Sequence, residues 1–283
     1  MSETGLRLLI FLGTFALVAL AEQFWPRRAR RQALGKRWRI NLGLLGIDML
    51  AQRFTLGAAA LSMAVYAQVQ GWGLFTLLAW SPWLSGLLGF VLLDLAIYLQ
   101  HRLFHRVPLL WRLHRVHHTD LDLDLTSGFR FHPLEILISL VYKVALVAAL
   151  GITPAVILIF EATLSAAALF NHGNFRLPAW LDSGLRLVLV TPDMHRVHHS
   201  VIPAETNSNY GFFIAFWDRL FGSYRPVPAA GHQGMTIGLQ AYQSEDQLGL
   251  LQLVIMPFRK ALLAAADGDM SSAIDSRSNA DAP

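Results

Sequence analysis

Long apolar segments alternate with short polar ones over the first 170 residues, and this pattern predicts membrane helices. One crossing takes about 20 apolar residues. Three segments come close to or exceed that length, at residues 8–24, 42–69 and 84–103. Residues 134–170 form a largely apolar stretch that is interrupted at Gly151-Ile-Thr-Pro154, so we expect a hairpin of two short helices that turns there. A later apolar stretch, 248–256, is too short to span and predicts a core or interfacial helix.

The charges beside the first apolar segment predict its orientation. A run of basic residues follows it, from Arg27 to Arg39, and such runs remain on the cytoplasmic side. Ala19-Leu-Ala21 is similar to a signal-peptidase site, but cleavage there would leave the basic run outside. We therefore predict an uncleaved first span. In the second span, Asp48 and Gln52 are expected near the membrane interface.

Composition agrees with a membrane protein. Of the 283 residues, 54% are hydrophobic and only 15% are charged, whereas a soluble domain carries about 25% charged residues. We predict an all-α fold, a multi-pass transmembrane bundle of about 4–5 membrane helices. It would form one integral-membrane domain over residues 1–263, followed by a disordered polar tail over 264–283. The absence of cysteine excludes thiolate metal sites, disulfides and a cysteine nucleophile. A net charge of +4, with no base-reading motif, favours a membrane partner and no nucleic acid.

Histidines form the main candidate chemistry. Eight of the eleven fall in three short clusters of the form HxxxH, HxxHH and HxxHH: His101 and His105; His114, His117 and His118; His195, His198 and His199. Residues at i, i+3 and i+4 share one face of a helix. The predicted spans place all three clusters at the cytoplasmic end of the bundle, so we expect them to converge.

Clustered neutral imidazoles are ligands for transition metals. One catalytic zinc takes about three protein ligands, so eight histidines predict two metals of iron, copper, zinc or nickel type. A zinc peptidase would need glutamate after the first histidine, where this chain has Arg102, Arg115 and Arg196. Two alternatives remain open at this point. One is a zinc-dependent membrane hydrolase, and the other is a non-catalytic metal-binding transporter or sensor.

The ordered set of three boxes resembles the fatty acid hydroxylase / sterol desaturase superfamily of integral-membrane di-iron oxygenases. The lead-in Asp94-x-x-x-Tyr98-x-x-His101-Arg102 and the segment Arg130-Phe-His132-Pro-Leu-Glu135 are similar to that family. So is the stretch from Asn209-Tyr-Gly211 to Trp217-Asp-Arg-Leu-Phe-Gly222. The resemblance covers residues 90–225, which we take as the histidine-box core.

The resemblance implies a membrane bundle with a cytosolic helical cap that holds two non-haem iron ions. It implies dioxygen as co-substrate and electrons from a separate reductase, ferredoxin or cytochrome-type protein. The expected reaction is hydroxylation or desaturation of a lipid such as a sterol, fatty acid or alkylglycerol. We expect the protein in a bacterial inner membrane, with its metals on the cytoplasmic side.

Further residues are candidates for the metal site. His172 is expected as a ninth ligand because the predicted hairpin returns it to the cytoplasmic side. His132 is either a ligand or a helix cap, and His232 is structural or exposed. Asp94 and Asp193 are candidate ligands or acceptors for the N–H groups of ligand imidazoles. Arg130 and Glu135 form a candidate structural ion pair.

Overall fold

The computed structural model describes residues 3–259, and the predicted polar tail over 264–283 lies outside this part. Within it, five segments are long and apolar enough to cross a membrane. This agrees with the four or five predicted spans. The long helices are α1 (Glu3–Phe24), α2 (Leu34–Thr55), α5 (Pro82–Arg106), α7 (Pro133–Leu150) and α8 (Pro154–His172). The second of the five segments, Leu34–Leu77, extends beyond α2 and includes the shorter helices that follow it. In the described residues, strand-like pairing is limited to isolated bridges such as Leu189 with Ile214, so the all-α prediction is confirmed.

Prolines determine where several of these helices begin. Pro82, Pro133 and Pro154 each occupy the first turn of a long helix, where the missing N–H costs nothing and the fixed φ suits the helix. The predicted hairpin turn is confirmed. Gly151 ends α7 with φ +70°, a left-handed conformation that glycine adopts without strain. Pro154 then starts the return helix α8.

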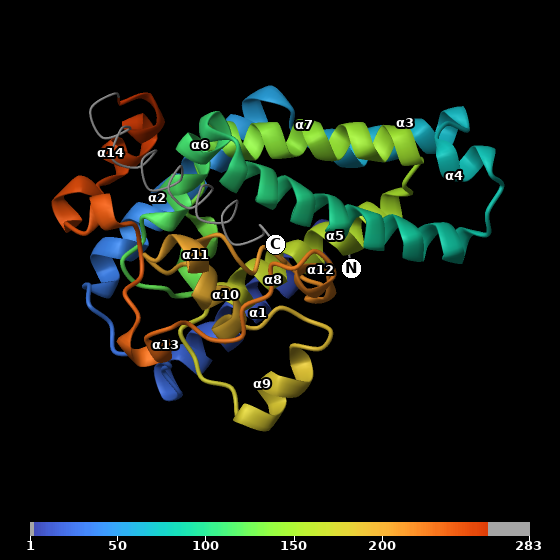
Figure 1. Cartoon of the computed structure of the whole chain (residues 1–283). Helices are drawn as coiled ribbons and strands as arrows, with labels where there is room; N and C mark the ends of the chain where they lie inside the picture. Colours follow the sequence, from blue (N-terminus) through green and yellow to red (C-terminus); the bar gives the residue numbers. More distant parts are fainter. Residues whose placement is uncertain (1–2, 260–283) are drawn as a thin grey trace, which may run out of the picture.

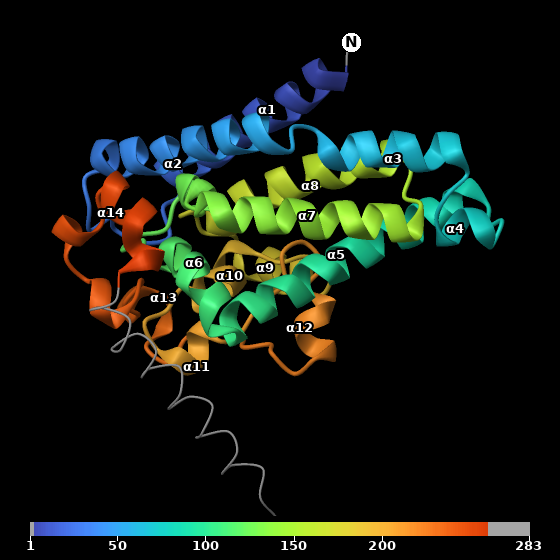
Figure 2. The ribbon, with the colours of Figure 1, turned by 90° about the horizontal axis from the view of Figure 1, so that it is seen from above.

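The second predicted span, 42–69, is wrong in its bounds. The chain forms two helices there, because α2 begins at Leu34 and ends at Thr55, and α3 (Ala59–Gln70) follows. Gly57 separates them with φ +52°. Figure 2 shows α2 and α3 running nearly end to end along one side of the bundle. The early start of α2 has a polar cause, since Arg37 and Asn41 on its first turns are buried against the cap.

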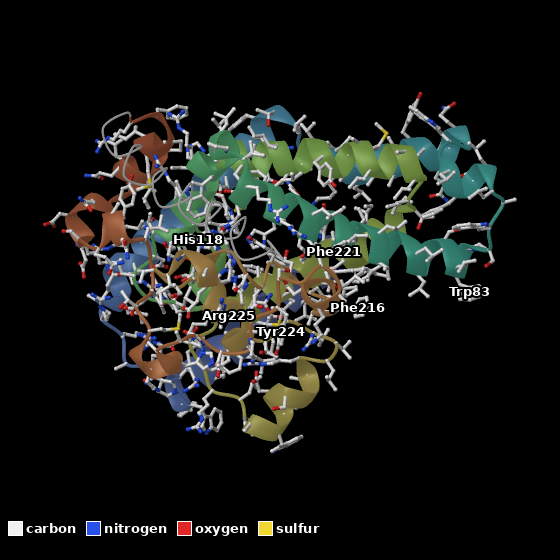
Figure 3. The ribbon with its side chains drawn as sticks, viewed as in Figure 1. Trp83, His118, Phe216, Phe221, Tyr224 and Arg225 are labelled. Carbon is white, nitrogen blue, oxygen red and sulfur yellow. The ribbon has the colours of Figure 1, made fainter. Side chains whose placement is uncertain are left out.

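Short helices gather at one end of the bundle and form the cap. They are α6 (Pro108–His118), η1 (Leu125–Phe129), α9 (Ala179–Leu185), α10 (Pro192–His198), α11 (Pro203–Thr206), α12 (Phe216–Leu220), α13 (Gly231–Gly234), η2 (Gln240–Tyr242), η3 (Glu245–Gln247), α14 (Leu250–Ile255) and η4 (Met256–Phe258). In Figures 1 and 2, α3 and α4 (Leu74–Leu77) lie at the opposite end from α13 and α14. Figure 3 likewise shows His118 inside the cap, far from Trp83 at the start of α5. The predicted short helix at 248–256 is therefore present as α14, which packs on α2.

Two kinds of packing hold the structure together, one within the bundle and one between the bundle and the cap. An apolar core, including Leu93, Val147 and Phe160, joins α3, α5, α7 and α8. A buried polar network ties α2 to the loop after α6. In it, Arg37 donates to Asp120 at 2.7 Å and to Asp124 at 2.5 Å. All three side chains are buried, and burying such charges is tolerable only because they are paired.

Candidate metal centre

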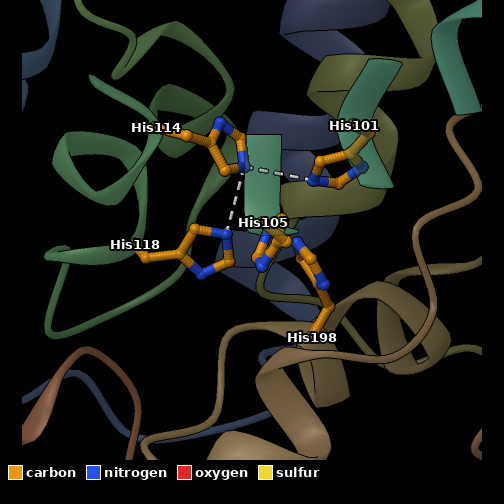
Figure 4. A group of neighbouring side chains, drawn as sticks. All are labelled: His101, His105, His114, His118 and His198. Atoms are coloured by element: carbon orange, nitrogen blue, oxygen red, sulfur yellow. Dashed lines mark hydrogen bonds between the residues drawn. The ribbon is translucent and has the colours of Figure 1, made fainter. Parts of the chain in front are cut away.

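The nine predicted histidines lie in two adjacent groups, each with its ligand nitrogens within 4.8 Å of one another. We call them site A and site B. Site A consists of His101, His105, His114, His118 and His198, and site B of His117, His172, His195 and His199. The side chains come from α5, α6, α8 and α10 or its C-terminal end, so segments far apart in sequence meet here. Figure 4 shows the five rings of site A turned toward a common centre.

The two HRVHH motifs each divide their histidines between the sites. In the first motif, His114 and His118 belong to site A and His117 to site B. In the second motif the assignment is reversed, since His195 and His199 belong to site B and His198 to site A. The two rings of each consecutive pair belong to different sites, and their planes are nearly perpendicular, at 88°. Helix geometry explains this, since consecutive residues are rotated by about 100° and the i+3 and i+4 side chains therefore flank the first histidine on opposite sides.

Hydrogen bonds at Nδ1 fix which nitrogen of each ring faces the site. His101 Nδ1 lies 2.8 Å from the carbonyl oxygen of Tyr210, and His114 Nδ1 lies 2.6 Å from a carboxylate oxygen of Glu135. A carbonyl and a carboxylate accept hydrogen bonds, so both Nδ1 atoms carry the proton and donate. The Nε2 atoms of His101 and His114 then carry no proton, and each has a free lone pair. They face each other at 3.1 Å, an arrangement that a cation between them stabilises.

Site B is organised in the same way. His172 Nδ1 donates to the carbonyl oxygen of Ala168 at 2.7 Å. Its Nε2 lies 3.1 Å from Nε2 of His117 and 3.0 Å from Nε2 of His195. In site A, His198 Nδ1 donates to the Ser208 carbonyl at 2.7 Å. Its Nε2 is buried with no hydrogen-bond partner among the described residues. Such orientation by outer acceptors is typical of metal-bound histidines.

The electrostatics keep these rings neutral. Burial lowers the pKa of His114 to about 3. Burial and then neighbouring histidines lower the pKa of the other cap histidines well below the usual value: His117, His118, His195, His198 and His199. Neutral imidazoles offer lone pairs at pH 7 without competition from protons. The donor set, nine histidines with neither cysteine nor carboxylate, fits iron, copper, zinc or nickel.

The two carboxylates predicted to accept hydrogen bonds from the ligand imidazoles, Asp94 and Asp193, have other partners. Asp94 instead accepts from Trp217 Nε1 at 2.8 Å and from the backbone N–H of Ile214 at 3.2 Å. Asp193 pairs with Arg27 and Arg196. Neither carboxylate binds a histidine of the two sites. Spacing along one helix suggested them, but their side chains are turned toward α12 and toward the basic loop.

Glu135 was the missed residue, and the predicted ion pair with Arg130 is also wrong. Arg130 donates to Asn41 Oδ1 at 3.0 Å and to the Val116 carbonyl at 3.2 Å. This leaves Glu135 to bind His114 on α6. The sequence carried one signal, a lone acid in the first turn of an apolar helix.

His132 lies outside both sites. Its Nδ1 accepts from the backbone N–H of Leu134 at 3.2 Å, and its Nε2 donates to the Val254 carbonyl at 3.0 Å. It therefore caps α7, one of the two predicted roles. His232 is buried, with Nε2 3.6 Å from Asp193, so its expected structural role is supported and its exposure is not.

A cavity of about 350 Å³ lies beside the histidines, among the membrane helices. It is lined by residues of α1, α2, α5, α7 and α8, and it reaches His101 and His114 of site A and His172 and His195 of site B. Its walls are largely apolar, with side chains such as Phe104 and Leu164. Asp48 and Gln52 of the second predicted span both lie in this wall, and their expected place near the membrane interface stays a prediction.

Comparison with known proteins agrees with this geometry. The fatty acid hydroxylase family model matches residues 86–223. The chain is 29% identical over 241 residues to the ornithine lipid hydroxylase OlsE of Rhizobium tropici, covering 80% of this chain and 70% of that protein. It is 27% identical to the alkylglycerol monooxygenase of Xenopus tropicalis, covering 74% of this chain but 46% of that protein. It is 30% identical to the cholesterol 25-hydroxylase of Rattus norvegicus, covering 52% of this chain and 51% of that protein. No solved structure gives a significant match.

Proposed function

The chain belongs to the fatty acid hydroxylase family, and on that premise we propose a membrane-bound di-iron oxygenase. It uses dioxygen and external electrons to hydroxylate or desaturate a C–H bond of a lipid. The observation that carries the proposal is the pair of all-histidine sites with bare Nε2 lone pairs facing one another. The nine histidines of sites A and B would hold the metals.

Iron, when bound, supplies the oxidising chemistry that no amino-acid side chain can provide. The residues of the chain have other tasks. Glu135 keeps the proton of His114 on Nδ1, and the carbonyls of Tyr210 and Ala168 do the same for His101 and His172. These contacts hold each ring in one tautomer and one orientation. Eight of the nine histidines are buried, which separates their rings from bulk water.

The substrate is proposed to reach the histidines from the bilayer. The cavity is lined by residues of the membrane helices and by histidines of both sites. This supports a lipid whose reacting carbon lies beside the metals while the rest of the molecule follows the apolar wall. The relatives named for ornithine lipid and alkylglycerol also act on lipids.

The orientation follows from the basic loop. Arg28 donates to the carbonyl oxygens of His232 at 2.5 Å and Met235 at 2.7 Å, both in the cap. The basic run thus lies on the same side as the histidines, and the positive-inside rule supports a cytoplasmic cap. A separate electron-donor protein, such as a reductase, ferredoxin or cytochrome-type protein, would approach from that side.

Metal analysis of protein purified without oxygen tests the proposal most directly. We expect about two irons per chain, given two nitrogen-rich sites, and dioxygen-dependent oxidation of a lipid once a reductant is supplied. The variant His198→Ala should lose iron and activity while the spans still insert. A single tightly held zinc, or a folded wild-type protein that takes up no metal, would contradict the di-iron assignment.

A further inference from the structure

Asp48 is a buried carboxylate in the cavity wall that the metal centre does not use. It lies on α2 inside a candidate membrane span, and its side chain is only 4% exposed. Its Oδ1 makes no hydrogen bond within residues 3–259. A buried polar group without a partner is costly, and ionisable groups inside a membrane are typically functional.

A second carboxylate lies in the same wall. Glu135 uses Oε1 to bind His114 at 2.6 Å, while its Oε2 is buried and has no partner in the described part of the chain. Both residues line the cavity, so two oxygen acceptors remain without donors there.

The basic residue of the cavity wall does not serve these acceptors. Lys143 is the one lysine or arginine among the described lining residues. Its Nζ lies 2.9 Å from Glu161, a carboxylate that Arg7 also contacts at 2.7 Å. The positive charge of Lys143 is therefore directed to α8 and away from Asp48.

The cavity also offers hydrogen-bonding groups beside Asp48. Gln52, one turn further along α2, is half-buried in the wall. Gln100 on α5 also lines the cavity and donates to Ser139 Oγ at 2.8 Å, so its amide oxygen remains an acceptor. A ligand group rich in N–H donors complements this set, whereas an anionic group would meet acceptors.

We propose that this cavity binds a lipid through a protonated amine, with the Asp48 carboxylate as the residue that selects it. The apolar walls take the hydrocarbon part, and the ammonium donates to Oδ1 of Asp48. The inference rests on the proposed function for its lipid substrate, but it concerns binding and requires no turnover. It favours aminolipids over fatty acids and over lipids whose polar group carries no charge.

Chain-matched ligands test the proposal on the wild-type protein. We would measure binding of radiolabelled octadecylamine to the protein in phosphatidylcholine nanodiscs, competed by unlabelled octadecanol, octadecanoate and octadecyltrimethylammonium. A charge-assisted hydrogen bond stabilises by about 1.5–3 kcal/mol, which corresponds to a preference of roughly tenfold or more for the amine. The trimethylammonium ligand keeps the charge but has no N–H, so it should bind more weakly than the amine.

Variants then identify the residue. Asp48→Asn preserves the shape of the side chain and should reduce the preference for amine over alcohol to within about twofold. Glu245→Gln is the matched control, because that carboxylate is on the surface and pairs with Lys36, and it should leave the preference unchanged. Strongest binding of octadecanoate, or an unchanged preference in Asp48→Asn, would overturn the proposal. If Asp48→Asn does not fold, the ligand series on the wild-type protein still decides.

This experiment separates the inference from the oxygenase proposal. If the amine preference is found but iron-loaded protein oxidises no lipid, the oxygenase function fails and the binding site remains. If oxidation of lipids occurs without any amine preference, the oxygenase function remains and the proposed amine-binding site fails.

Discussion

The contact between Glu135 and His114 gives the sharpest test of how the metal centre is built. The carboxylate accepts from Nδ1 at 2.6 Å, both side chains are buried, and the contact leaves Nε2 of His114 as a lone pair directed at site A. We expect Glu135→Gln and Glu135→Leu to weaken metal binding by different amounts.

The magnitudes follow from what each variant keeps. Glutamine can still accept from Nδ1 but without charge. Charged hydrogen bonds stabilise by about 1.5–3 kcal/mol and neutral ones by about 0.5–1.5 kcal/mol, so the loss is about 1–1.5 kcal/mol, or roughly tenfold in metal affinity. Leucine removes the acceptor and leaves the ring free to rotate. Loss of such an acceptor typically costs 10–100-fold in affinity, and leucine should fall toward the upper end.

Competition with a chromophoric chelator measures these affinities on metal-free protein without lipid. Asp94→Asn and Asp193→Asn are the controls, because these carboxylates bind Trp217 and Arg27, not a ligand histidine. They should change metal affinity by less than about threefold. If either control weakens metal binding as much as Glu135→Leu does, our account of the outer acceptors is wrong.

Three further predictions concern the ligands, the cap and the close packing around site B. The variant His172→Ala should lose about half of the bound metal, because it removes the site B ring whose Nε2 faces both His117 and His195. The variant His132→Ala should retain the metal and only lower the melting temperature. Equal metal content in the two variants, measured by elemental analysis, would contradict this. The variant Arg37→Met leaves two buried carboxylates unpaired and should destabilise by about 3–5 kcal/mol. The same ion pair gives a pH test in the wild-type protein. Burial raises the pKa of Asp120, but the positive charges of Arg37 and Arg130 outweigh burial and lower the pKa to about 2 from 3.8. The stabilisation is therefore complete above pH 3.8 and is lost as the pH falls toward 2, and thermal melts between pH 6 and 2.5 should show a steeper decline in wild type than in Arg37→Met. The variant Gly128→Ala should impair metal binding at site B, because its Cβ would lie 2.9 Å from the Ala168 carbonyl that orients His172; an unchanged metal stoichiometry would refute it.

The local pattern of the sequence was enough to predict most of the elements. The apolar segments, the glycine–proline turn at Gly151 and the histidines at i, i+3 and i+4 are short-range features, and short-range sterics decide them. The break between α2 and α3 was missed, because a single glycine inside an apolar stretch rarely ends a helix.

What the sequence determined was the set of nine histidines and their position at one end of a membrane bundle. What the tertiary structure decided was the role of each carboxylate around them. Asp94, Asp193 and Glu135 are all acids near a histidine motif, and spacing favoured the first two. The outcome depends on which helix packs against which side chain. Trp217 on α12 binds Asp94, and Arg27 in the basic loop binds Asp193. The packing of α6 against α7 brings His114 to Glu135. These contacts are long-range, so no local pattern specifies them.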